Sequence, residues 1–263
     1  SNDMTMEDYD ALARQLTDTT YGSQVYGCHY HTWRSAVELF GILDGKHSIL
    51  DGNYDWMIPY YDMILSEEDD GVCQTYTDLS TEGLHYSAAF SNGNVAMMNM
   101  GSWFISTLIS NLDSGEYDSS LCGNWGIASY PHPDGAEAGS TIATITGLAV
   151  TSASANKDAA FDFVNWVSGT EGAKVMASTG NFPAIMTDDV INTIAGMAGF
   201  PTDEGSKEAL NITNAYLEVP YAENVSEINS ILDTYHTSIM NREVTVEEGV
   251  ASMNEQVGKI LNQ

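Results

Sequence analysis

The sequence predicts an α/β fold that contains more helix than strand. Short stretches rich in β-branched residues, such as "TIATITGLAV" at 141–150, alternate with longer runs that have helical spacing of apolar residues, such as 246–261. No repeat of fixed period is present. With 263 residues and 43% hydrophobic content, the chain is able to bury a sizeable core.

Charge excludes two classes of partner. Eight Lys and Arg stand against 37 Asp and Glu, which gives a formal net charge of -29. Such a chain repels phosphate backbones and anionic lipid, so nucleic acid and acidic membranes are not expected as partners. We interpret the acidity as a solvated surface. No window approaches the ~20 apolar residues of a membrane span, and "SNDMTMEDYD" carries no signal-peptide pattern. We expect any export signal or lipid-anchor cysteine to lie ahead of this chain.

The first elements follow from local signals. Residues 6–16 have helical spacing, and Thr5 and Asp8 stand like an N-cap and its third residue. A short strand is expected at 23–28, followed by a helix that includes 33–40 and ends near two glycines.

The middle of the chain alternates connections, strands and helices. The acidic segment 64–83 reads as a connection between helices, and 84–90 as a helix. The apolar run 95–100 predicts a buried strand, and a helix follows from 103 through 108.

The remainder is mostly helical after two further strands. Strands are expected at 124–131 and within 141–152, and helices at 190–197, 207–217 and 225–240, after two helices within 154–184. The last helix, within 245–261, has a capping-box pattern in Thr245 and Glu248.

Motifs for catalysis are missing. There is no GxSxG elbow, P-loop, GxGxxG after a strand or HExxH, and carboxylates are too abundant for any pair to stand out. His29 and His31 beside Cys28 suggest a metal cluster, but no third ligand is evident in the sequence. Cys28, Cys73 and Cys122 are widely separated, and their odd number leaves at least one thiol free. We therefore expect no metal, no cofactor and no enzyme activity.

Aromatic residues carry the remaining signal. Tyr30 and Trp103 stand where a predicted strand becomes a helix, which is where α/β sheets bind ligands. Aromatic faces suit the C–H faces of neutral sugars. Core packing is the alternative for each ring, and we assign Trp33, Trp125 and Trp166 to the core.

Five segments in the same order resemble one family. They are "MTMEDYDALARQL" with "CHYHTW", "FSNGNVAMMNMGSW", "NWGIASYPHPDG", "ITGLAVTSASANKDAAFDFVNWVSGTEGAKVMASTGNFPA" and "VTVEEGVASMNEQVGKIL". Together they resemble the bacterial extracellular solute-binding proteins of sugar ABC importers, of the maltose-binding-protein-like kind. Each motif is loose alone, but their order over nearly the whole chain is specific.

The resemblance implies a periplasmic-binding-protein-like lobe of type II, helix-rich with a short mixed sheet. It implies that 1–137 form the first part of a C-terminal lobe, that 138–187 are a strand-helix segment that normally completes the N-terminal lobe, and that 188–263 form the helical second part of the C-terminal lobe. Most of the N-terminal lobe has no counterpart in this chain, which makes it resemble a fragment. Lobe closure would then bend hinges near 131–139 and 184–188.

Ligand-binding residues are also implied by the resemblance. Trp103 corresponds to the family's stacking aromatic after the Ala-Met strand, and Tyr30 to an aromatic before the Thr-Trp pair. Asn229 stands where the maltose-binding-protein-like pattern has an aromatic, and Ile145 and Thr146 replace a Gly-Gly-Trp, so a maltodextrin is not expected. The implied site residues are Trp103, Tyr30, His31, Ser102, Asn229 and Thr146.

The resulting hypothesis is an extracytoplasmic substrate-binding component of an ABC transporter that captures a sugar or oligosaccharide. Its partners would be a carbohydrate ligand and the membrane permease subunits, and it would be secreted, lipid-anchored or periplasmic. The alternatives are a glycoside-active enzyme and a non-catalytic carbohydrate-interaction domain. We also expect this chain by itself either to dimerise through 141–167 or to hold that segment in an altered, mobile arrangement, because an uncovered apolar strand and helix favour contact with another copy.

Overall fold

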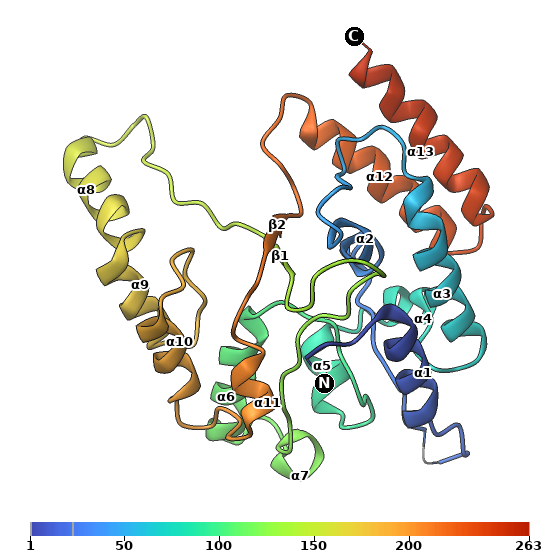
Figure 1. Cartoon of the computed structure of the whole chain (residues 1–263), viewed down its shortest axis with the longest axis horizontal. Helices are drawn as coiled ribbons and strands as arrows, with labels where there is room; N and C mark the ends of the chain where they lie inside the picture. The colour runs from blue at the N-terminus through green and yellow to red at the C-terminus, as the bar shows by residue number, and fades with distance from the viewer. Residues whose placement is uncertain (1, 23, 263) are drawn as a thin grey trace. The chain divides into compact units, whose positions relative to one another are not determined.

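The computed structural model describes residues 2–22 and 24–262, so the first residue of the strand expected at 23–28 lies outside the described residues. The chain forms two compact units (Figure 1). Unit 1 comprises Ser1–Asn99, Ser129–Thr144 and Ile212–Gln263, and unit 2 comprises Met100–Ala128 and Ile145–Asn211. Within the described residues, no helix is long and apolar enough to cross a membrane.

Unit 1 is mainly helical. Its helices are α1 (Met6–Leu16), α2 (Ser35–Ile42), the 3-10 helix η1 (Asp55–Met57), α3 (Ile58–Asp69), α4 (Tyr76–Glu82), α5 (Tyr86–Ser91), α12 (Val225–Met240) and α13 (Val246–Leu261). Both predicted capping boxes are present, Thr5 with Asp8 on α1 and Thr245 with Glu248 on α13. The bounds of α12 are those predicted, because its apolar stripe of Ile228, Leu232 and Ile239 is a local feature of the sequence.

The regular sheet of unit 1 is small. Strands β1 (Thr141–Ala143) and β2 (Ala215–Leu217) pair in parallel, with Ile142 opposite Tyr216. Isolated bridges extend the pairing: Tyr26 with Val95, His29 with Met98 and Thr5 with His132 in parallel, and Asp18 with Val25 antiparallel. The strands expected at 23–28 and 95–100 are therefore reduced to single bridges, whereas the α/β class is confirmed.

The core of unit 1 lies between α2, α3, α12 and α13. Figure 1 shows α12 and α13 running alongside each other, and their apolar stripes close the core from one side. The fully buried members with the largest side chains include Phe40, Tyr54, Tyr61, Leu232 and Ile239. Burial of such side chains stabilises the unit by about 1.5–3 kcal/mol each before the conformational entropy cost.

Unit 2 has a smaller core. Its helices are α6 (Trp103–Ser114), α7 (Ser119–Cys122), α8 (Lys157–Val167), α9 (Thr170–Ala177), α10 (Asp188–Ala195) and α11 (Glu204–Glu208). Its core cluster consists of Ala173, Ala177, Val190, Ile194, Phe200 and Leu210. Trp125 is half-buried with its ring 6.3 Å from that of Phe200. No residue of α8 is buried, and Trp166 is 48% exposed, so the prediction that Trp166 is a core residue is wrong.

Three predictions of secondary structure are wrong for identifiable reasons. The supposed connection 64–83 is largely helical, because the Thr75 side chain caps α4 and Gly83 ends it in the left-handed conformation. The supposed helix 207–217 overlaps only the end of the short α11 (Glu204–Glu208), and its last residues form β2, which pairs in parallel with β1. Residues 124–131 form no regular strand, since no neighbouring segment pairs with them among the described residues.

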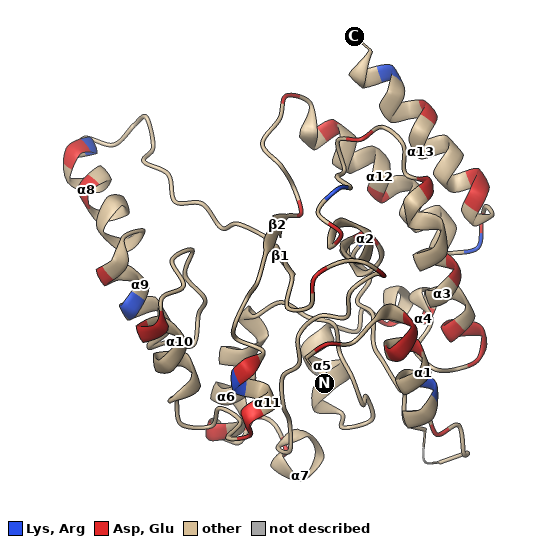
Figure 2. Ribbon diagram, in the orientation of Figure 1, with Lys and Arg blue, Asp and Glu red and all other residues tan. Residues whose placement is uncertain are grey.

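Acidic side chains cover both units. Figure 2 shows Asp and Glu on most helices and few Lys and Arg. The acidic balance is therefore a property of the whole surface and not of one tail, as the composition suggested.

Candidate functional site

Four rings gather on the surface of unit 1, and we call them the aromatic patch: His31, Trp33, His85 and Tyr86. The His31 ring lies 4.5 Å from the Trp33 ring, 5.8 Å from that of His85 and 5.4 Å from that of Tyr86, each edge to face. The Trp33 and Tyr86 rings are 5.7 Å apart. This spacing is that of mutually packed aromatic side chains.

Local structure positions the patch. His31 and Trp33 lie in the segment between the His29 bridge and α2, whereas Tyr86 begins α5 and His85 is its N-cap. The His85 ring accepts a hydrogen bond from the Ser87 backbone N–H at 3.3 Å. Two turns that come from separate parts of the sequence therefore present their rings together.

Trp33 is exposed, which contradicts its assignment to the core. The ring is 43% exposed, whereas Val37 and Phe40 are fully buried. Helix α2 begins at Ser35, so Trp33 precedes the helix and does not share the face on which one-turn spacing was expected to place it. It is available to a ligand on one side and packs on its neighbours on the other.

The environment of His31 favours the neutral form of its ring. Burial lowers the pKa of His31, and the nearby His85 lowers it further. A neutral imidazole offers one donor and one acceptor beside the apolar ring faces. Such a surface suits an uncharged, hydroxyl-bearing ligand better than a charged one.

Tyr30 faces the interior of unit 1. Its ring packs edge to face against Tyr9 and against Phe40, each at 6.4 Å, and the residue is 6% exposed. Burial raises the pKa of its hydroxyl well above the usual range. Of the two neighbouring residues singled out from the sequence, His31 joins the aromatic patch and Tyr30 joins the core.

Trp103 is the first residue of α6 in unit 2 and is 41% exposed. Its ring lies over Gly101 so closely that a Cβ there would come within 2.1 Å of a ring carbon. The glycine of "MGSW" is thus required by the close approach of the indole. Ser102, at the N-cap position, is half-buried, and Thr146 is exposed in the irregular segment after β1.

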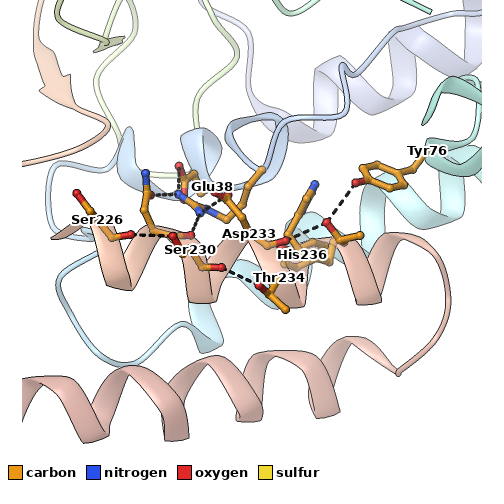
Figure 3. Close-up of polar contacts among 11 residues, drawn as sticks. Glu38, Tyr76, Ser226, Ser230, Asp233, Thr234 and His236 are labelled. Carbon is orange, nitrogen blue, oxygen red and sulfur yellow. Dashed lines mark hydrogen bonds and ion pairs between the residues drawn. The ribbon is translucent and has the colours of Figure 1, made fainter. Parts of the chain in front are cut away.

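Asn229 belongs to a polar network on α12. Its side-chain oxygen accepts a hydrogen bond from Arg34 Nη2 at 2.5 Å, and its backbone oxygen accepts one from Arg34 Nη1 at 3.0 Å. Arg34 also pairs with Glu38 and with Asp233, at 2.6 and 2.5 Å. Figure 3 shows Glu38 and Asp233 meeting at this network, while Ser226, Ser230 and Thr234 follow α12 beside it.

His236 lies further along α12 in the core. Its Nδ1 is 3.0 Å from the Tyr61 hydroxyl, and the Tyr76 ring meets it edge to face at 5.6 Å (Figure 3). Burial, with a smaller effect of the Arg34 charge, lowers the pKa of His236 to about 3. The ring is therefore neutral at physiological pH and acts as a structural hydrogen-bonding group.

Comparison with known proteins identifies the family. A model of the bacterial extracellular solute-binding proteins matches residues 55–198, which is more than half of the chain. The chain belongs to this family. Membership of an extracellular family also implies that the protein is extracytoplasmic. No curated protein gives a significant match.

Solved structures agree on the fold. A sugar transporter from Rhizobium etli, in an open conformation, is 46% identical and superposes with a TM-score of 0.90 over 98% of this chain and 65% of that chain. An ABC substrate-binding protein from Listeria monocytogenes in complex with cycloalternan is 19% identical, with a TM-score of 0.75 over 100% of this chain and 65% of that one. The sugar-binding protein MalE from Xanthomonas citri is 17% identical, with a TM-score of 0.67 over 99% and 64%.

These matches confirm the periplasmic-binding-protein-like fold predicted from the sequence. The chain spans 65% of the length of the Rhizobium etli and Listeria monocytogenes proteins. Two of the segments that resemble this family, "MGSW" and "CHYHTW", both end at a half-exposed tryptophan.

Sequence reasoning missed His85 and Tyr86. They follow a turn that ends at Gly83, and a His-Tyr pair directly after a helix stop was a visible signal for ring exposure. Their meeting with His31 and Trp33 is a tertiary contact between positions more than fifty residues apart, which no local pattern in the sequence specifies.

Proposed function

We propose that the protein is the substrate-binding component of an ABC importer that captures a sugar or oligosaccharide. The observation that carries this proposal is the half-exposed aromatic patch on a chain of the solute-binding family. Rings of this kind pack against sugar C–H faces, and the neighbouring imidazole and hydroxyl groups bond to sugar hydroxyls. The Rhizobium etli relative, described as a sugar transporter, supports the same class of ligand.

Within this proposal, His31 and Trp33 of the aromatic patch contact the ligand in unit 1, and Trp103 and Ser102 are separate candidates in unit 2. Thr146 and Asn229 stay candidates for hydrogen bonds, although Asn229 also holds Arg34. Tyr30 supports the patch from the core and is proposed to position His31. A charged ligand is disfavoured, since the acidic surface repels anions and the patch carries no carboxylate for a cation.

The protein captures its ligand without chemistry and passes it to permease subunits, with lobe closure about hinges near 131–139 and 184–188. It is proposed to be secreted, periplasmic or lipid-anchored. On this proposal 1–137 and 188–263 build the C-terminal lobe of the whole protein, and 138–187 contribute to its other lobe. This division differs from the two compact units, in which 145–187 pack with 100–128 and 188–211.

The test is calorimetric titration of the full-length protein with a panel of neutral oligosaccharides and, in parallel, with charged sugars. We expect one neutral sugar to bind and Trp33→Ala to weaken it, by about 1–3 kcal/mol by analogy with base stacking on aromatics. Tyr221→Ala is the matched control, because this fully exposed ring of unit 1 lies outside the patch. Equal binding by Trp33→Ala and wild type would refute the role of the patch, and hydrolysis of the bound sugar would instead support a glycoside-active enzyme.

A further inference from the structure

A buried cluster in unit 1 brings together three side chains that are typical metal ligands: Cys28, Glu67 and Cys73. One donor atom from each lies within 4.8 Å of the other two. All three are buried, at 0%, 0% and 3% exposure. The chain assembles them by backbone contact, because the Gly27 backbone N–H donates to the Val72 carbonyl at 2.8 Å.

The carboxylate of Glu67 has no adequate partner among the described residues. Neither of its oxygens makes a hydrogen bond of ordinary geometry, although Tyr30 and Asp10 lie close by. The hydroxyls of Tyr9 and Tyr30 are likewise buried without such a bond within the described part of the chain. Burying a carboxylate and two hydroxyls without good hydrogen bonds lowers the free energy of unfolding, so this cluster calls for an explanation.

The nearby cation, Arg14, does not form an ion pair with Glu67. Arg14 lies in the same region, but its guanidinium is already bound to Asp10 at 2.8 Å and to Asp70 at 2.5 Å. Asp10 adds negative charge near Glu67.

We propose that Cys28, Glu67 and Cys73 bind a zinc ion, with the Tyr30 or Tyr9 hydroxyl or a water molecule as the fourth ligand. Two thiols and a carboxylate are a donor set that suits zinc, because thiolates select against Mg²⁺ and Ca²⁺. The three donors lie close enough together to surround one tetrahedral ion. The proposal concerns a site separate from the aromatic patch and does not depend on the ligand that the patch binds.

The site has a structural role. Cys28 precedes the segment that carries His31 and Trp33, Glu67 lies on α3, and Cys73 follows α3 by a short turn. A zinc ion at this point ties α3 to the base of the aromatic patch. Because all three ligands are enclosed, the metal enters while the protein folds, so binding free energy contributes directly to folding.

The experiment uses the full-length protein, refolded with its thiols reduced, first with zinc and then with cobalt(II) as a spectroscopic substitute. We expect about one zinc ion per chain after dialysis, measured by plasma mass spectrometry, and a thiolate-to-cobalt charge-transfer band. Glu67→Gln should lower zinc affinity at least as much as the roughly 10- to 100-fold typical of losing an outer-shell partner. Cys28→Ser and Cys73→Ser should abolish the cobalt band.

Cys122→Ser is the matched control, since this buried thiol belongs to unit 2. It should keep the full zinc content and the cobalt band. The cobalt spectrum of the wild type keeps the test decisive where a ligand variant fails to fold. The proposal is overturned by reduced wild type that retains no zinc, by Glu67→Gln that binds zinc as tightly as wild type, or by loss of zinc in Cys122→Ser. It is overturned equally if Cys28 and Cys73 of the protein isolated from its own cell resist alkylation until a reductant is added, because a disulfide then joins them.

Discussion

Arg34 and Glu38 form a buried ion pair at the start of α2, and Arg34 also bonds to α12. Two guanidinium nitrogens of Arg34 donate to the two carboxylate oxygens of Glu38, at 2.6 and 3.2 Å, and Glu38 is fully buried. The remaining donors of Arg34 reach Asn229 and Asp233 on α12. The network thus fixes α2, the helix that follows Trp33, against α12.

Glu38→Gln should destabilise the protein strongly. It leaves a buried guanidinium without its enclosed counter-ion, and removal of one partner of a buried pair costs about 3–5 kcal/mol. Asp233→Asn is the comparison, because Asp233 is largely exposed and should cost less than about 1 kcal/mol. Urea unfolding monitored by circular dichroism measures both, and equal losses would contradict the argument from burial.

Trp33→Ala should cost little stability, about 1 kcal/mol, because its ring is half-exposed and its contacts are those of surface aromatic pairs. Phe40→Ala, at a fully buried position on α2, should cost about 3–5 kcal/mol of stability. Chemical unfolding of the two variants beside wild type tests this contrast. Were Trp33→Ala as damaging as Phe40→Ala, Trp33 would have to be returned to the core.

Local features of the fold could be predicted from the sequence, whereas the exposure of Trp33 could not. Capping boxes such as Thr245 with Glu248 depend on residues three apart, so a short stretch of sequence contains the whole signal. The family was likewise recognisable from ordered motifs. The exposure of Trp33 was not, because it depends on where α2 begins and on which rings from α5 lie beside it.

Features that depend on contacts between residues far apart in the sequence could not be predicted, for the same reason. Residues 215–217 have helix-compatible composition, and they form a strand because β1, more than seventy residues earlier, offers backbone partners. The sequence shows no evident metal ligands to accompany Cys28, because Glu67 and Cys73 lie beside it only in the folded chain. Whether Tyr30, Ser102, Thr146 and Asn229 touch a ligand stays a prediction.

Gly101→Ala should weaken ligand binding while the fold is retained. A Cβ at Gly101 would come within 2.1 Å of the Trp103 ring, so the half-exposed indole must shift. Gly147→Ala is the control, since a Cβ there meets no atom within 4 Å. Calorimetric titration with the sugar identified in the panel compares the variants. Unchanged affinity in Gly101→Ala would argue against a role of Trp103 in binding.

His236 should make stability fall at acidic pH. Its pKa is lowered to about 3 in the folded state, below the value of about 6.5 in an unfolded chain. Above about pH 6.5 the ring is neutral in both states, and its contribution to stability is complete. Between about pH 6.5 and about pH 3 the unfolded chain binds a proton that the folded chain does not, so stability decreases by up to about 1.4 kcal/mol per pH unit.

The measurement is the free energy of unfolding of wild type and His236→Gln across that pH window. The variant has no group to protonate at this position, so the difference between the two proteins should shrink as the pH falls. A difference that stays constant with pH would show that His236 titrates alike in both states.

This chain by itself should associate with itself through α8 and the segment before it. Phe161, Phe163 and Trp166 are 63%, 61% and 48% exposed, and no residue of α8 is buried. Ile145 and Leu148 are also exposed in the segment that leads to the helix. Exposed apolar side chains gathered in this way favour contact between copies.

Phe161→Glu combined with Phe163→Glu should therefore shift the chain toward monomer, because two buried charges would oppose a contact between α8 helices. Tyr221→Glu is the matched control, since it introduces a charge at a fully exposed ring of unit 1 and should leave association unchanged. Light scattering over a range of concentrations measures the mass of each variant. A wild-type chain that remains monomeric at every concentration would contradict the prediction, and loss of association in Tyr221→Glu would move the interface away from α8.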